Sequence, residues 1–105
     1  MITAEFFLQG ERFSGVSVRG HAGYAAYGHD VVCASVTSAV ELVANGITEI
    51  LKIPASVGAF ENEVRIDLPD DLPVEAEQFL KALRLHLELL KQDYPENLRL
   101  TDTEV

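Results

Sequence analysis

The spacing of apolar residues changes its period along this chain, and that change limits the folds that the chain can adopt. Apolar and polar residues alternate over residues 2–9 and again over residues 12–19, which is the pattern of half-buried strands. From Val32 the apolar residues instead recur every three or four positions, as in an amphipathic helix, until Pro54 ends the pattern. The first half of the chain therefore predicts two strands followed by one helix.

The second half repeats that order and adds one strand. Residues 56–61 and 63–68 alternate again, and a second helical pattern follows a turn and ends near Tyr94. Leu98 and the residues after it predict a last strand at an edge of the sheet. The order ββαββαβ predicts an α+β fold, with a mixed, mainly antiparallel sheet of about five strands and two helices. A chain of 105 residues fits a single domain over residues 1–105.

The chain is acidic, with 8 Lys and Arg residues against 17 Asp and Glu residues and a formal net charge of −9. This balance argues against binding to nucleic acid, because phosphate backbones are held by clustered Lys and Arg side chains. A basic polypeptide is a better electrostatic partner. No uninterrupted apolar run approaches the roughly 20 residues that span a bilayer, and the first residues lack the basic start of a signal peptide. We therefore expect a cytoplasmic protein that does not bind membranes.

The only cysteine, Cys33, excludes an internal disulfide and any cysteine-rich metal cluster within one chain. It stands near the start of the first predicted helix, and Asp30 three residues earlier is the predicted N-cap. This position places Cys33 in the first helical turn, where free backbone N–H groups favour a thiolate and can stabilise an oxyanion. The residue type and the position suit a cysteine nucleophile.

Two histidines flank the segment before Cys33, and each could act as a general base. His21 follows the second predicted strand, and His29 lies four residues before Cys33. Because a strand end is a fixed platform, His21 is the better placed base. Asp30 could serve as the N-cap alone, or it could also orient His21 as an acid orients the base in Ser-His-Asp triads.

Other interpretations of these residues are open at this stage. A lone cysteine at the start of a helix is most often a small buried hydrophobe, and Asp30 is most often a plain N-cap. Both histidines could join Asp30 and Cys33 around zinc, but the adjacent His29 and Asp30 would have to converge from one segment, so we expect no metal. The glycines match neither a dinucleotide-binding motif nor a Walker motif, and we expect no cofactor.

The segment GHAGYAAYGHDVVCASV, residues 20–36, resembles the signature of the ribosomal processing cysteine protease family, Prp. The resemblance is close over this segment, and the chain length and order of elements suit the family throughout. The family's two catalytic positions fall on His21 and Cys33. This implies that Cys33 is the nucleophile and His21 the base, with Asp30 as a supporting residue. It also implies a substrate-binding loop that contains Gly20, Gly23, Tyr24, Gly28 and His29.

The resemblance further implies a cytoplasmic endopeptidase that removes the N-terminal extension of the large-subunit ribosomal protein bL27. It also implies a homodimer, and Leu85 and Leu89 form a second apolar strip on the second helix that suits a subunit interface. The main alternative is a non-catalytic, ribosome-associated assembly or interaction protein that holds a basic tail without cutting it. A redox-sensing thiol at Cys33 is a third hypothesis.

Overall fold

Five strands and two long helices make up the described fold, in the predicted order ββαββαβ. The computed structural model describes residues 1–20 and 27–105, and of residues 27–30 it describes the backbone alone. In chain order the elements are β1 (Ile2–Gln9), β2 (Arg12–Gly20), α1 (Tyr27–Asn45), η1 (Gly46–Ile50), β3 (Ser56–Phe60), β4 (Glu63–Asp67), α2 (Val74–Asp93) and β5 (Leu98–Glu104). The short η1 is a π-helical segment that continues α1. The predicted α+β fold is therefore confirmed.

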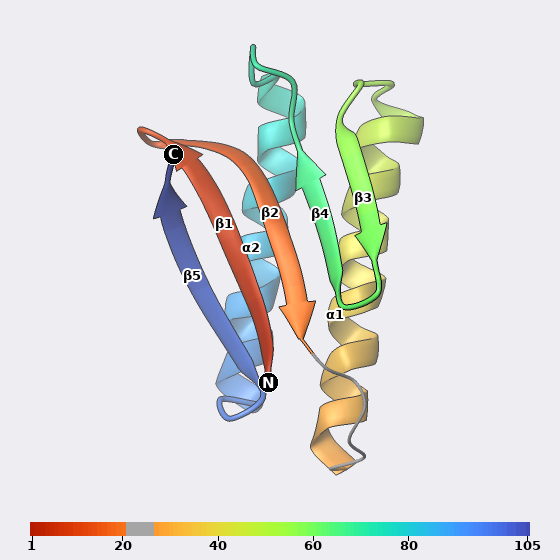
Figure 1. Ribbon diagram of the computed structural model, residues 1–105, viewed down its shortest axis with the longest axis vertical. Helices are drawn as coiled ribbons and strands as arrows, with labels where there is room; N and C mark the ends of the chain where they lie inside the picture. Colours follow the sequence, from red (N-terminus) through yellow and green to blue (C-terminus); the bar gives the residue numbers. More distant parts are fainter. Residues whose placement is uncertain (21–26) are drawn as a thin grey trace.

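The strands form one mixed sheet in the order β3-β4-β2-β1-β5. β1 pairs with β2, β2 with β4 and β4 with β3 in the antiparallel direction, whereas β5 lies parallel to β1. Figure 1 shows α1 and α2 next to each other on one face of this sheet, with α1 behind β3 and β4. Both helices of the described chain thus cover the same face of the sheet.

The hydrophobic core lies between the sheet and the two helices, because alternate strand residues face the helical layer. Phe6 of β1, Val16 of β2 and Ile66 of β4 are fully buried. They belong to the same apolar cluster as Leu80 and Leu83 of α2. Full burial of a side chain of this size stabilises the fold by about 1.5–3 kcal/mol. The apolar residues that recur along the strands and helices therefore pack together in one core.

Helix α1 begins at Tyr27, well before the predicted start near Val32, so this part of the sequence prediction is wrong. Asp30 is the fourth helical residue and not the N-cap, and Cys33 lies in the second turn and not the first. The sequence did not predict this first turn because residues 27–30 show no apolar period. A helix already anchored in the core extends through Gly28 at a cost of about 1 kcal/mol relative to alanine.

The segment Val31–Ile50 is long and apolar enough, by length and composition, to cross a membrane. The sequence prediction of no apolar run near this length is therefore wrong. In the structure its most apolar side is turned to the protein core, where Val32, Val36, Val40 and Ile47 are buried. These residues share one helical face, which is the pattern of a core helix.

Glu77 on α2 is buried, although its place in the sequence resembles the solvated side of a helix. Its side chain is only 4% exposed, and its carboxylate accepts a hydrogen bond from Arg12 Nε at 2.6 Å and another from the Phe13 N–H at 2.9 Å. The guanidinium of Arg12 also donates to the carbonyl oxygen of Leu72 at 2.6 Å. These bonds attach the start of β2 to the start of α2.

Burial by itself would raise the pKa of Glu77, but the hydrogen bonds from Phe13 and Arg12 outweigh burial and lower the pKa below its usual value. A lowered pKa in the folded state means that the stabilisation is complete above the unfolded-state value of about 4.3. It is lost as the pH falls through the folded-state pKa.

We expect Glu77→Gln to reduce the free energy of unfolding by about 1–3 kcal/mol at pH 7, because the buried N–H and the guanidinium lose a charged acceptor. The variant should also lose part of the acid sensitivity of the wild type between pH 5 and pH 3. Urea denaturation at several pH values measures both effects. Glu75→Gln, an exposed residue on the same helix, is the matched control. Equal stability and equal pH dependence of wild type and Glu77→Gln would contradict this role.

Gly20 ends β2 in a backbone conformation that side chains rarely adopt, with φ at +140°. A Cβ atom at this position would lie 2.5 Å from the carbonyl oxygen of Met1 and 2.7 Å from Cα of Ile2. Both neighbours are backbone atoms that cannot turn away. Only glycine therefore fits where β2 passes the N-terminal end of β1.

We expect Gly20→Ala to destabilise the fold by about 2–4 kcal/mol, since backbone strain and a backbone clash act together. Gly10→Ala separates these two effects, because Gly10 also has positive φ, at +64°, but a Cβ atom there would meet no atom of the described residues within 4 Å. The cost of Gly10→Ala should be near 1–2 kcal/mol, the approximate strain of a left-handed residue. Thermal or urea unfolding compares the two variants. Similar losses in both would show that the contact with Met1 and Ile2 carries little energy.

Candidate active site

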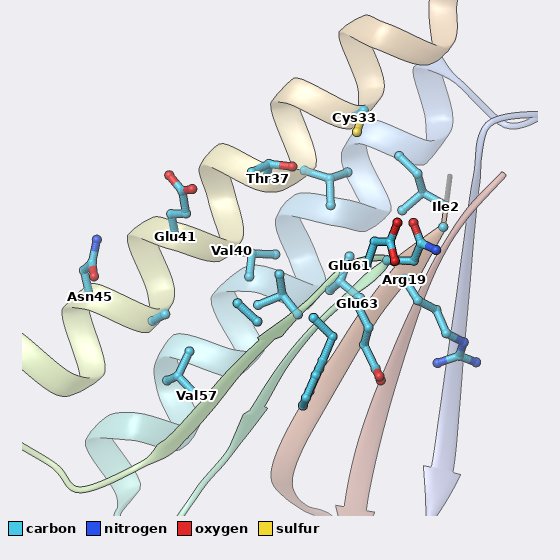
Figure 2. A pocket seen from close by; sticks show the side chains of 18 residues that line it. Ile2, Arg19, Cys33, Thr37, Val40, Glu41, Asn45, Val57, Glu61 and Glu63 are labelled. Atoms are coloured by element: carbon cyan, nitrogen blue, oxygen red, sulfur yellow. The ribbon is translucent and has the colours of Figure 1, made fainter. Parts of the chain in front are cut away.

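A groove with a volume of about 400 Å³ runs between α1 and the strands β2, β3 and β4 (Figure 2). Its lining comes from four parts of the chain: the start of β1, the end of β2, one side of α1, and the β3–β4 hairpin. The part of the sheet near β3 is the edge, so the groove is bounded by strands on one side and by a helix on the other. Cys33 lies on its helical wall.

The helical wall includes side chains from successive turns of α1. Cys33, Thr37, Glu41 and Asn45 follow one another at a spacing of four residues and all line the groove. At 1.5 Å per residue the row from Cys33 to Asn45 is about 18 Å long. An extended chain advances about 3.3 Å per residue, so the wall matches about five residues of an extended peptide.

The floor of the groove is apolar and partly open to solvent. Val57 and Ala59 on β3 pair with Ile66 and Val64 on β4, and Val57, Ala59 and Val64 line the groove. Ile66 is fully buried, whereas Val57 is 44% exposed. The edge of the sheet therefore extends beyond the cover of α1 and offers apolar surface beside the row of helical side chains.

Cys33 is a free thiol that is partly exposed. In Figure 2 its sulfur points from α1 toward the strands, and Cys33 lines the described part of the groove. The expectation that Cys33 occupies the first helical turn is wrong, so its own N–H is not one of the four free N–H groups at the start of the helix. What the structure provides is a partly exposed sulfur that faces a groove able to hold a peptide.

The other predicted site residues differ in how much of each the structure describes. Gly20 is the last residue of β2 and lines the same groove as Cys33. Residues His21, Gly23 and Tyr24 lie outside the described residues. The backbones of Gly28, His29 and Asp30 belong to the start of α1. The sequence pattern did not reveal the groove itself, because its two walls are far apart in the chain.

Charged side chains near the groove divide into paired and unpaired groups. Arg19 points away from the groove in Figure 2 and forms an ion pair with Glu5 at 3.0 Å. Glu5 accepts a hydrogen bond from the hydroxyl of Thr103 and one from Arg19, and these bonds hold the pKa of Glu5 below its usual value despite partial burial. Glu63 accepts a hydrogen bond from Ser17.

Glu41 and Glu61 also line the groove, and neither has an ion-pair or hydrogen-bond partner among the residues that the structure describes. Among the side chains of residues 1–20 and 31–105, no three His, Cys, Asp or Glu residues converge as metal ligands. The described part of the groove is thus a mainly apolar channel that is also lined by acidic side chains and by the Cys33 thiol.

Comparisons with known proteins agree with this geometry. The family model described as cysteine protease Prp matches residues 1–99. The ribosomal processing cysteine protease Prp of Bacillus subtilis (strain 168) is 33% identical over 88 residues, which cover 78% of this chain and 79% of that protein. The protein of the same name from Staphylococcus aureus (strain NCTC 8325 / PS 47) is 28% identical over 103 residues, covering 95% and 97%.

Solved structures give the same result. A crystal structure of the ribosomal processing protease Prp from S. aureus with a substrate peptide matches with a TM-score of 0.90 and 25% identity, covering 98% of this chain and 100% of that chain. A second structure of that protease, with a covalently linked product peptide, matches with a TM-score of 0.86 and 26% identity over the same shares. With a family match over nearly all of its length and an accessible cysteine in a peptide-sized groove, this chain belongs to the Prp family of ribosomal processing cysteine proteases.

Proposed function

We propose that this cysteine protease removes the N-terminal extension of the large-subunit ribosomal protein bL27, with Cys33 as nucleophile and His21 as general base. The observation that carries the proposal is that Cys33 points its sulfur into a groove whose described helical wall, from Cys33 to Asn45, matches about five residues of an extended peptide. The related S. aureus protease has been crystallised with substrate and product peptides, which supports a peptide as the occupant.

The reaction follows from the chemistry of a thiol beside a base. The base takes the proton of Cys33, and the thiolate attacks the carbonyl carbon of the scissile bond. The peptide C–N bond breaks, the base returns the proton to the leaving amine, and the N-terminal part of the substrate remains as a thioester on Cys33. A water molecule, deprotonated by the same base, then hydrolyses the thioester and restores the thiol.

Two features support His21 as that base. Gly20 lines the groove that contains Cys33, and His21 is the next residue in the chain. Gly20 is also fixed by its close packing on Met1 and Ile2, so the chain leaves β2 at a defined place beside the groove. Asp30 lies three residues before Cys33 in α1, and we assign it the role of a positioning residue for His21.

The acidic character of the protein supports a ribosomal protein as substrate. A net charge of −9 attracts basic polypeptides at low ionic strength, and ribosomal proteins must carry basic surface to bind RNA. This attraction accelerates encounter and does not by itself choose the bond that is cut.

The test is mass spectrometry of a peptide that spans the extension junction of bL27 from the same organism. We expect the wild type to cut one bond, whereas Cys33→Ser and His21→Ala should lose cleavage by at least about a hundredfold and still bind the peptide. Ser38→Ala, on the part of α1 that faces away from this groove, is the control that should retain cleavage.

Each other outcome has a separate meaning. Peptide binding without cleavage by the wild type would favour the non-catalytic assembly or interaction protein. Cleavage that persists in Cys33→Ser would disprove the nucleophile, and cleavage that persists in His21→Ala would disprove the base. Peptide binding that changes when peroxide oxidises Cys33 would favour the redox hypothesis.

We also propose that the enzyme is a homodimer. Leu85 and Leu89 are 58% and 52% exposed on the outer side of α2, as the sequence predicted, and Leu42 on α1 is 70% exposed. Exposed apolar side chains of this kind are typical of subunit interfaces.

Analytical ultracentrifugation at micromolar concentration should therefore give a dimer for the wild type and a shift toward monomer for Leu85→Ser/Leu89→Ser. The double variant should remain folded, because neither side chain contributes to the core. A monomeric wild type at this concentration would refute the dimer. A dimer that is unaffected by the double variant would show that the interface lies elsewhere.

A further inference from the structure

We propose that the substrate peptide binds as an added strand on the outer edge of β3, held by the backbone groups of Val57 and Ala59. The inference rests on the proposed peptide cleavage and specifies how the peptide is held. It assigns the binding to the backbone of the sheet edge, so it predicts which backbone positions of the substrate matter.

The hydrogen bonds between β2 and β4 show which way each residue of β4 points its backbone. The Gly20 N–H donates to the carbonyl oxygen of Asn62 at 3.2 Å. At the other end of the pair, the Leu68 N–H donates to the carbonyl oxygen of Ser14 at 2.9 Å. In an antiparallel ladder, residues bonded to one neighbouring strand alternate with residues bonded to the other. The even-numbered residues of β4 therefore bond to β2, and the odd-numbered residues bond to β3.

This alternation leaves two residues of β3 with outward-pointing backbone groups. The odd-numbered residues of β4 lie opposite Ser56, Gly58 and Phe60, which therefore bond to β4. The N–H and C=O groups of Val57 and Ala59 point away from β4 and have no backbone partner among the residues that the structure describes. Four free backbone groups are thus presented at the two-residue repeat of an extended chain.

The side chains of the same two residues face the groove that contains the thiol. Val57 lies opposite the fully buried Ile66, so its side chain is on the face of the sheet that the helices cover. Val57, Ala59 and Cys33 all line the groove, as does Val40 of α1. A strand added beside β3 turns every second side chain toward α1. Its backbone bonds and its side-chain burial are therefore provided at one place.

The edge of β3 also leads toward Cys33. β3 ends at the turn that contains Asn62, and this turn is bonded to Gly20 at the end of β2. Gly20 and Cys33 line the same groove. A peptide that follows β3 toward its turn is thus directed to the part of the groove that the thiol faces.

The two outer strands of the sheet differ in their suitability for such pairing. β5, with the sequence LRLTDTE, carries three charged side chains, which is typical of an edge protected against another strand. β3, with the sequence SVGAF, carries no charge and no proline. Val57 is 44% exposed and Phe60 is 65% exposed. β3 is therefore the edge suited to accept a peptide strand.

The first experiment scans the backbone of the bL27 junction peptide. One N–H at a time is replaced by N-methyl, and fluorescence anisotropy on Cys33→Ser gives each dissociation constant. Because a strand turns every second N–H toward its neighbour, two positions two residues apart should each lose about tenfold in affinity. N-methylation of the residue between them should cost less than about threefold. Losses that do not alternate would overturn the inference.

The second experiment changes the edge of the enzyme itself. Ala59→Pro removes the outward N–H and leaves the bonds between β3 and β4 in place, since proline is tolerated where the N–H of an edge strand faces solvent. Introduced into Cys33→Ser, it should weaken binding of the unmodified peptide by about tenfold. Unchanged binding would overturn the inference. If Ala59→Pro fails to fold in urea denaturation, the N-methyl scan decides alone.

Glu104→Pro is the matched control on the opposite edge of the sheet. The Val105 N–H donates to the carbonyl oxygen of Leu8 at 2.8 Å, so the N–H of the preceding residue, Glu104, points outward from β5. Because β5 is the outer strand farthest from β3, this variant should keep the affinity within about twofold. A loss equal to that of Ala59→Pro would overturn the inference.

A second copy of the chain is the other possible occupant of the β3 edge. Analytical ultracentrifugation of Ala59→Pro tests this, because an edge used for dimer formation loses its N–H in the same variant. A shift from dimer to monomer with unchanged peptide affinity would overturn the inference and assign the edge to the subunit interface.

The binding measurements separate this inference from the proposed activity. Alternating losses on Cys33→Ser support the added strand even if the wild type cuts none of the peptides, a result that would count against the proposed function alone. Cleavage by the wild type without alternation in the scan would overturn the inference and leave the proposed function standing. No binding of any peptide would also overturn the inference.

Discussion

The packing of one apolar stripe of α1 on the sheet is the interaction on which both the fold and the site depend. Val32, Val36, Val40 and Ile47 are buried in this contact. Because side chains on a helix have fixed angular positions, burial of this stripe sets the rotation of the whole helix. Cys33 lies beside this stripe on the helix and therefore faces the groove. The direction of the thiol is thus a consequence of core packing.

The sequence predicted the elements well where the information is local. The alternation in β1 and β2 and the helical period of α2 reflect one-sided burial of each element, and this burial is what the structure shows. The start of α1 was mispredicted because Gly28 and its neighbours have no apolar period, although a helix anchored farther along can include them. The order of strands and the parallel pairing of β5 with β1 depend on contacts between distant segments.

The residues of the candidate site also divide into those that a short segment reveals and those that only the fold brings together. Cys33 and Gly20 were identified from a short segment, and the structure places both on one groove. Glu61 was not identified, because the hairpin that carries it meets α1 only through the folded sheet. Glu77 was also missed: a glutamate in a helix is normally solvated, and only its contacts with Arg12 and Phe13 explain its burial. A residue pattern does not reveal a partner that lies sixty or more positions away.

The parallel pairing of β1 and β5 places the two ends of the chain at opposite ends of the sheet (Figure 1). Ile2 lines the groove, and the backbone of Met1 lies against Gly20, so the N-terminal end is next to the thiol. Val105 lies at the far end of the sheet, where its N–H donates to the carbonyl oxygen of Leu8. Any affinity tag, fluorophore or surface linkage attached ahead of Met1 would therefore compete with substrate for the same space, whereas an attachment after Val105 leaves the groove accessible.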